Sequence, residues 1–143
     1  MQSRLLNAGP QKTYALILST GEDVLPCILQ FAKEQHLGGS QLTAIGAFER
    51  VVLGYFDWQR KDYKRIPVDG QVEVVSMIGD IALNDGEPAL HVHVVIGRSD
   101  GIAMGGHLLE ARVRPTLEIV ITESPAHLVR RHDAETGLAL IRF

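Results

Sequence analysis

The chain has 143 residues, of which 45% are hydrophobic and 22% are charged. This length and composition are typical of one globular domain that buries a core without cross-links, and the single cysteine, Cys27, excludes a disulfide within the chain. With 14 basic against 17 acidic residues, the net charge of -3 provides no overall attraction to nucleic acid or to an anionic membrane surface.

No boundary, repeat or linker divides the chain, so we expect a single domain over residues 1–143, with about residues 1–11 loosely held. No run of eighteen apolar residues occurs, and we therefore expect no membrane span. A lone cysteine fits a reducing compartment, so the expected location is the cytoplasm.

The first predicted elements are a strand over residues 13–19 and a helix that follows Gly21. Acidic residues 22 and 23 favour a helix N-terminus, and apolar residues recur at helical spacing from Leu25 to Ala32. The pair Gly38-Gly39 is expected to end this helix.

Residues 41–56 are rich in strand-forming side chains and lead into a hairpin whose tip covers residues 57–65. This tip combines two aromatic residues, Trp58 and Tyr63, with the strongest local concentration of positive charge, namely Arg60, Lys61, Lys64 and Arg65. Such a cluster can stack bases and contact phosphates, but a solvated tip balanced by nearby acids is the favoured interpretation. The four cations are the nucleic-acid candidates.

The second half of the chain reads as strands joined by tight turns. Strands are predicted over 71–83, 89–96 and 116–122, with Asn84-Asp85-Gly86 as a hairpin turn between the first two and further short segments around 135–137. The predicted fold class is α+β: a mainly antiparallel sheet with one long helix and possibly a short second helix near 105–111.

Three of the six histidines are candidates for one metal site. His91 and His93 are two positions apart in a predicted strand, so their side chains point to the same face. His107 on a return segment would supply a third imidazole, and Gly105-Gly106 before it allow close backbone approach. Three protein ligands leave a position open for water or substrate. The alternative is that the histidines only decorate a half-solvated sheet face.

Five segments, in order, make the sequence similar to a known family. They are Gly21-Glu22-Asp23-Val24-Leu25, Thr43-Ala44-Ile45-Gly46-Ala47, Gly70-Gln71-Val72-Glu73-Val74-Val75, His91-Val92-His93 and Gly105-Gly106-His107-Leu108. From about Lys12 to Phe143, the chain resembles the plants-and-prokaryotes-conserved (PPC) domain. The resemblance implies a homotrimer, stand-alone in prokaryotes, in which His91, His93 and His107 hold a zinc-like ion.

The resemblance also bears on whether the chain binds DNA. Plant members bind DNA through an Arg-Gly-Arg-Pro hook that this chain lacks, and their Gly-Arg-Phe-Glu-Ile-Leu motif is altered here, with Gln71 and Val72 in place of Arg and Phe. The preferred prediction is therefore a homotrimeric regulatory or DNA-associated binding module that holds a divalent metal, with DNA, DNA-binding proteins or a small molecule as partners. Direct DNA binding through residues 60–65 stays an alternative.

A second function is a zinc-dependent lyase or hydrolase, because the family is similar in fold to acetolactate decarboxylase, whose zinc is held by three histidines. Glu118 is then the candidate proton carrier. The favoured interpretation of Glu118 is an acid that orients a histidine or pairs with Arg112 or Arg114. Imidazole ligands suit zinc, copper, nickel and iron alike, so zinc is named from the resemblance.

Overall fold

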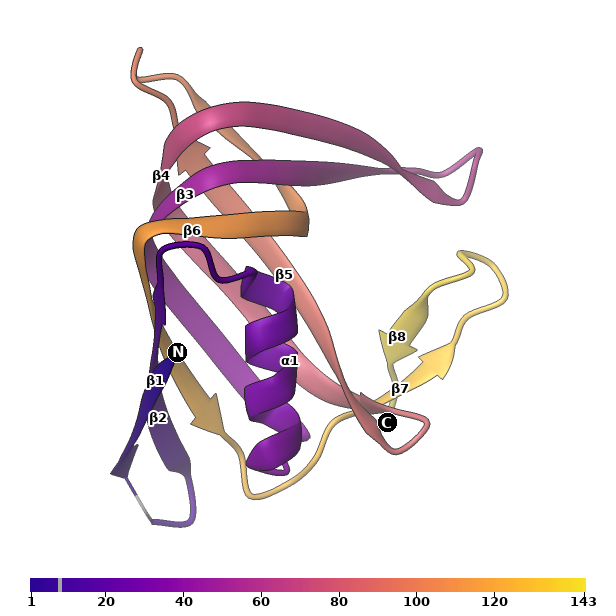
Figure 1. The fold of residues 1–143 in the computed structure, drawn as a ribbon. Coiled ribbons are helices and arrows are strands. Elements are labelled where there is room, and N and C mark those ends of the chain that lie inside the picture. Colours follow the sequence, from indigo (N-terminus) through magenta and orange to yellow (C-terminus); the bar gives the residue numbers. More distant parts are fainter. Residues whose placement is uncertain (8) are drawn as a thin grey trace.

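The computed structural model describes residues 1–7 and 9–143. It consists of one helix and eight strands (Figure 1). In chain order these are β1 (Gln2–Asn7), β2 (Lys12–Ser19), α1 (Val24–Glu34), β3 (Gly39–Asp57), β4 (Asp62–Asn84), β5 (Glu87–Gly97), β6 (Ala103–Glu123), β7 (Val129–His132) and β8 (Ala139–Ile141). The segment expected to be loosely held, about residues 1–11, thus contributes β1, which pairs with β2.

The strands form one sheet in the order β1-β2-β6-β3-β4-β7-β8, with β5 bound to both β4 and β6. All pairs are antiparallel except β4 with β7, which confirms the predicted antiparallel character. Since β3 also pairs with β4 and β6, the path β3-β4-β5-β6-β3 closes into a ring. Four long strands therefore enclose a common core.

Helix α1 lies against the inner side of the sheet (Figure 1). Its buried residues Val24, Ile28, Phe31 and Ala32 recur at helical spacing, and Tyr14 of β2 meets the Phe31 ring edge-on. The prediction of a long helix was wrong, because the helix has only eleven residues. It ends at Glu34, and Gly39, expected to stop it, instead begins β3.

The predicted short helix near residues 105–111 was also wrong. This stretch is part of β6, where it pairs with β5 on one side and β3 on the other. A side chain at Gly106 would place its Cβ 2.8 Å from the carbonyl oxygen of Gly54, so the glycine permits the close strand approach that the sequence suggested. Pairing on both edges overrides the local helical preference of the residues that follow.

The turn between β4 and β5 sets the strand register, and with it which side chains of β5 face away from the core. Its two loop residues, Asp85 and Gly86, have φ angles of 51° and 84°, as a type I′ turn requires. Along β5, Val92, Val94 and Ile96 are buried in the core, so the alternating residues His91, His93 and Val95 lie on the opposite side, which we call the outer face.

No helix in the described part of the chain is long and apolar enough to cross a membrane.

Candidate metal centre

The sheet register brings the three predicted histidines together. His93 of β5 lies opposite His107 of β6, and His91 is two residues before His93 on the same face. On the other edge of β5, Asp80 of β4 lies opposite His91. The pairing of β5 with β4 and β6, together with the alternation of side chains along β5, thus places three imidazoles and a carboxylate on the outer face.

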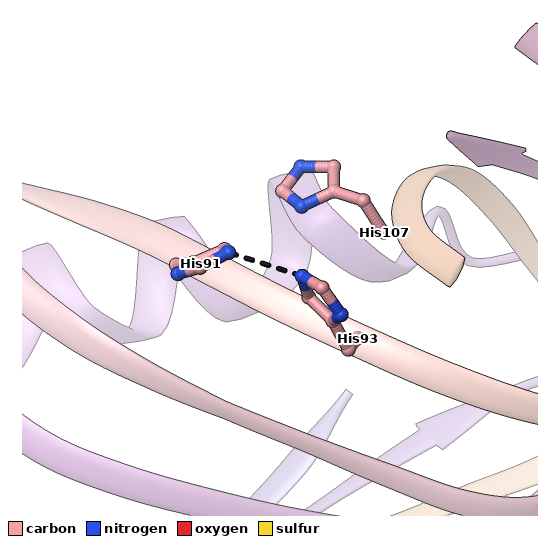
Figure 2. A group of neighbouring side chains, drawn as sticks. All are labelled: His91, His93 and His107. Carbon is pink, nitrogen blue, oxygen red and sulfur yellow. Dashed lines mark hydrogen bonds between the residues drawn. The ribbon is translucent and has the colours of Figure 1, made fainter. Parts of the chain in front are cut away.

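Figure 2 shows the rings of His91, His93 and His107 turned toward one another. The Nε2 atoms of His91 and His93 are 3.1 Å apart, and one ring nitrogen from each histidine lies within 4.8 Å of the other two. The ring centroids are 5.0 to 5.4 Å apart. Among the described residues, this is the group of histidine, cysteine or acidic side chains that could hold a metal ion.

The third histidine carries an unsatisfied nitrogen. His107 Nδ1 is buried and has no hydrogen-bond partner. Burial, followed by repulsion from the other two histidines, lowers the pKa of His107 to about 4, and burial with repulsion from His93 also lowers the pKa of His91. His107 is therefore neutral at pH 7, and a neutral imidazole nitrogen is the form that binds a metal.

These residues fit a zinc-type ion. With zinc–nitrogen bonds of about 2.0 to 2.1 Å, the nitrogens of a tetrahedral site lie about 3.3 Å apart. The pair at 3.1 Å already has this spacing, and small ring rotations would bring in the third nitrogen. An ion would also satisfy His107 Nδ1, whose burial without a partner is otherwise unfavourable.

Neighbouring groups hold the rings in place. The Tyr63 ring stacks on His107 with centroids 4.6 Å apart and planes 24° from parallel. At Gly79 an added Cβ would lie 2.5 Å from the backbone oxygen of His91, so β4 and β5 approach closely only because this residue is glycine. The sequence placed Tyr63 only among the aromatic residues of the hairpin tip, and it gave no signal that Gly79 lies beside a site.

An open groove of about 570 Å³ borders the cluster on the outer face. Its walls come from β3, β4 and β5, and they present His91 and His93 together with an amide, a hydroxyl and apolar side chains. The lining residues are Gln41, Leu42, Thr43, Ile78, Gly79, Asp80, His91 and His93. A small molecule in this groove would lie directly beside two of the candidate ligands.

Glu118, the proposed proton carrier, lies on the outer face but not beside the histidines. It is exposed on β6 and pairs with Ile45 of β3. The order β6-β3-β4-β5 puts it three strands from the histidines of β5, roughly 14 Å at the usual strand spacing. Within one chain, Glu118 is therefore separate from the metal cluster.

The four nucleic-acid candidates lie at and after the β3–β4 turn. Arg60 and Lys61 are in the turn itself, Lys64 and Arg65 follow on β4, and all four are exposed. Arg65 forms an ion pair with Glu110 of β6. Asp57 accepts hydrogen bonds from the backbone N–H groups of residues 59 and 60, so the tip is stabilised by its own acid as well as carrying positive charge.

Comparison with known proteins identifies relatives. A family model for the Plants and Prokaryotes Conserved (PCC) domain matches residues 6–125. The crystal structure of a plant- and prokaryote-conserved protein from Pyrococcus horikoshii is similar, at 34% identity and a TM-score of 0.86 over 99% of this chain and 95% of that one. No curated protein matches the sequence significantly.

Two further relatives are each 29% identical. A metal-containing protein from Archaeoglobus fulgidus has a TM-score of 0.85 over 99% of this chain and 97% of its own. A protein from Ralstonia eutropha that its name assigns provisionally to DNA binding has a TM-score of 0.84 over 91% and 90%. A Staphylococcus aureus protein described as similar to α-acetolactate decarboxylase shares the fold, at 15% identity and a TM-score of 0.55 over 76% and 51%.

Proposed function

Because this chain belongs to the Plants and Prokaryotes Conserved domain family, we propose that it is a homotrimeric binding module whose His91, His93 and His107 hold one divalent metal ion, zinc in the first instance. The metal shapes a small-molecule site in the adjoining groove and gives the protein a regulatory or DNA-associated role. The cytoplasm is the proposed location, since one cysteine fits a reducing compartment.

One observation carries the metal assignment: a buried, neutral imidazole nitrogen of His107 has no hydrogen-bond partner and faces two more imidazoles. Burial of such a group costs free energy unless something binds it. The Archaeoglobus fulgidus relative, named as metal-containing, supports the same assignment. An all-histidine set fits zinc, nickel, copper or iron better than calcium or magnesium, which prefer oxygen.

Three protein ligands would leave a coordination position open, where a bound ion would act as a Lewis acid toward an oxygen of a bound small molecule. The chain itself supplies the groove, in which the Gln41 amide and the Thr43 hydroxyl can hydrogen-bond and Ile78 can pack. A small molecule with one metal-binding oxygen and an apolar body matches this surface.

Zinc itself should stabilise the protein. Untagged protein purified without chelator is expected to contain close to one metal ion per chain. Removal with a chelator should lower the Tm, and zinc at a hundred times its Kd should restore about 3 kcal/mol, or roughly 10 °C. Metal analysis and thermal unfolding measure both effects. Metal-free protein that gains nothing from zinc, nickel, copper or iron would contradict the proposal.

The outer face supports the trimer. Five large apolar side chains on neighbouring strands are 40 to 60% exposed there: Ile45, Val75, Ile78, Val95 and Val120. The pairings Val120 to Thr43, Thr43 to Ile78 and Ile78 to His93 place them in continuity with the histidines. A contiguous apolar patch on a sheet marks an interaction surface, and further copies of the chain are the partners we propose.

Catalysis is the alternative function, favoured by the groove that opens beside His91 and His93. It would be a zinc-dependent lyase or hydrolase, of which the fold of the acetolactate decarboxylase-like protein offers an analogy. Because Glu118 is three strands from the histidines of its own chain, it could serve as proton carrier only toward the site of another subunit. Screening small keto acids for metal-dependent turnover tests the lyase, and absence of turnover would remove that activity.

DNA association comes from the names of relatives and from the exposed cations of the β3–β4 turn. If the turn contacts phosphates, its affinity for DNA must fall steeply between 50 and 200 mM salt. For a few phosphate contacts the expected loss of affinity is about 10- to 1,000-fold. Replacing Arg60, Lys61 and Lys64 with glutamine should abolish the mobility shift, while the same change at the exposed Arg131 should not. Absence of a DNA mobility shift at low salt would show that the chain does not bind DNA directly. Any association with DNA would then have to pass through DNA-binding partner proteins.

A further inference from the structure

The last part of the chain folds against the strand behind the histidines. Residues 126–143 lie beyond the part that the family model matches, and they contain β7 and β8. β7 pairs in parallel with the end of β4, where Asn84 lies opposite Arg130, and β8 pairs with β7. This C-terminal hairpin therefore extends the sheet next to the candidate metal centre.

Arg130 is the residue through which the hairpin reaches the site. Its side chain is only 8% exposed, although arginine is seldom buried without a strong partner. One terminal nitrogen forms an ion pair with Asp80 Oδ1, and the other donates to the backbone oxygen of Ala139 at 3.1 Å. Its guanidinium thus links the hairpin to a carboxylate on β4.

Asp80 in turn faces a candidate ligand. Its second oxygen, Oδ2, is 3.8 Å from His91 Nδ1, and the two residues are cross-strand partners. The other nitrogen of the same ring, Nε2, lies 3.1 Å from His93 Nε2. His91 therefore has one nitrogen in the cluster and one toward the carboxylate, and a small ring rotation would bring the latter within hydrogen-bond distance.

We propose that Arg130 is a positioning residue for the metal centre: it holds Asp80 so that the carboxylate accepts a hydrogen bond from His91 Nδ1–H and leaves Nε2 free to bind the ion. The proposal rests on the metal-binding function proposed above. A ligating histidine commonly donates its other N–H to a carboxylate, and loss of that partner weakens metal binding about 10- to 100-fold.

The competing explanation is that Arg130 only docks the hairpin. Both explanations expect a lower Tm when Arg130 is changed, so stability alone does not separate them. A positioning role also changes the metal affinity of the folded protein and the proton position on His91, which a docking role leaves unaltered.

The test compares Arg130→Met with Arg131→Met, which removes the same charge from the next, exposed residue of β7. Zinc affinity is measured at pH 7 by competition with a chromogenic chelator. Arg130→Met should bind zinc about 10- to 100-fold more weakly, and Arg131→Met should bind as the unchanged protein does. Asp80→Asn should show a similar loss, and the double variant should lose no more than either single one.

A second measurement needs no metal. Long-range ¹H–¹⁵N NMR of the metal-free protein should show His91 protonated at Nδ1, and Arg130→Met should give a mixture of tautomers. Unchanged zinc affinity in both Arg130→Met and Asp80→Asn would overturn the proposal, even if Tm falls. If the unchanged protein binds no zinc, and removal of His91 and His93 has no effect either, the metal function itself fails and the positioning role with it.

Discussion

Replacing His91 and His93 together with alanine is expected to reduce bound zinc from about one ion per chain to less than a tenth. The single remaining imidazole of His107 cannot retain an ion that needs three protein ligands. Both changed side chains lie on the outer face and not in the core, so the metal-free variant should keep its strand content and unfold cooperatively. Metal analysis, circular dichroism and thermal unfolding measure these outcomes.

The matched control removes two other histidines. His127→Ala/His132→Ala deletes the same number of imidazoles from exposed positions outside the cluster, so its zinc content should stay near one. A variant without His91 and His93 that still carries a full complement of zinc would show that the ion binds elsewhere. The three rings would then form only a hydrogen-bonded group on the sheet.

Replacing Ile45 with aspartate is expected to convert the proposed trimer into folded monomers, with a change in solution mass from about 47 kDa to the 15.7 kDa of one chain. Ile45 is 60% exposed in the single chain, so its loss leaves the core intact. In an assembly the new carboxylate would be buried in an apolar interface beside Glu118, its cross-strand neighbour, and both charges would oppose association. Light scattering coupled to size exclusion measures the mass.

Ile102→Asp provides the control for that change. Ile102 is 56% exposed in the loop between β5 and β6, away from the strand pairs that carry the patch, and its replacement should leave the mass at three chains. If Ile45→Asp also leaves the mass unchanged, the apolar outer face does not join the subunits. A mass of one chain for the unchanged protein would reject the trimer outright.

Much of the site follows from one predicted turn. Asp85-Gly86 is a two-residue turn, and pairing outward from it makes Asn84 face Glu87 and therefore Asp80 face His91. Alternation along β5 then puts His91 and His93 on one face. The same register identifies Asp80 from the sequence, and the predicted grouping of His91, His93 and His107 is present in the structure.

Other features depend on long-range pairing that no local pattern reports. Residues 108–111 are good helix formers, yet pairing with β3 and β5 makes residues 105–111 part of a strand. Arg130 reaches the site through a parallel pairing of β7 with the end of β4, about fifty residues before it. The alternation that exposes Glu118 was readable, but its three-strand separation from β5 follows from strand order.

The closed ring of β3, β4, β5 and β6 has a consequence for ion choice. His93 and His107 extend from neighbouring strands that are each paired on both sides, so the distance between their backbones cannot widen without the loss of sheet hydrogen bonds. Little conformational freedom would be lost if such a preorganised site bound an ion, and this would favour tight binding. The proposed site would then favour ions whose bonds to nitrogen suit the spacing that the two strands impose, and larger ions would bind less tightly.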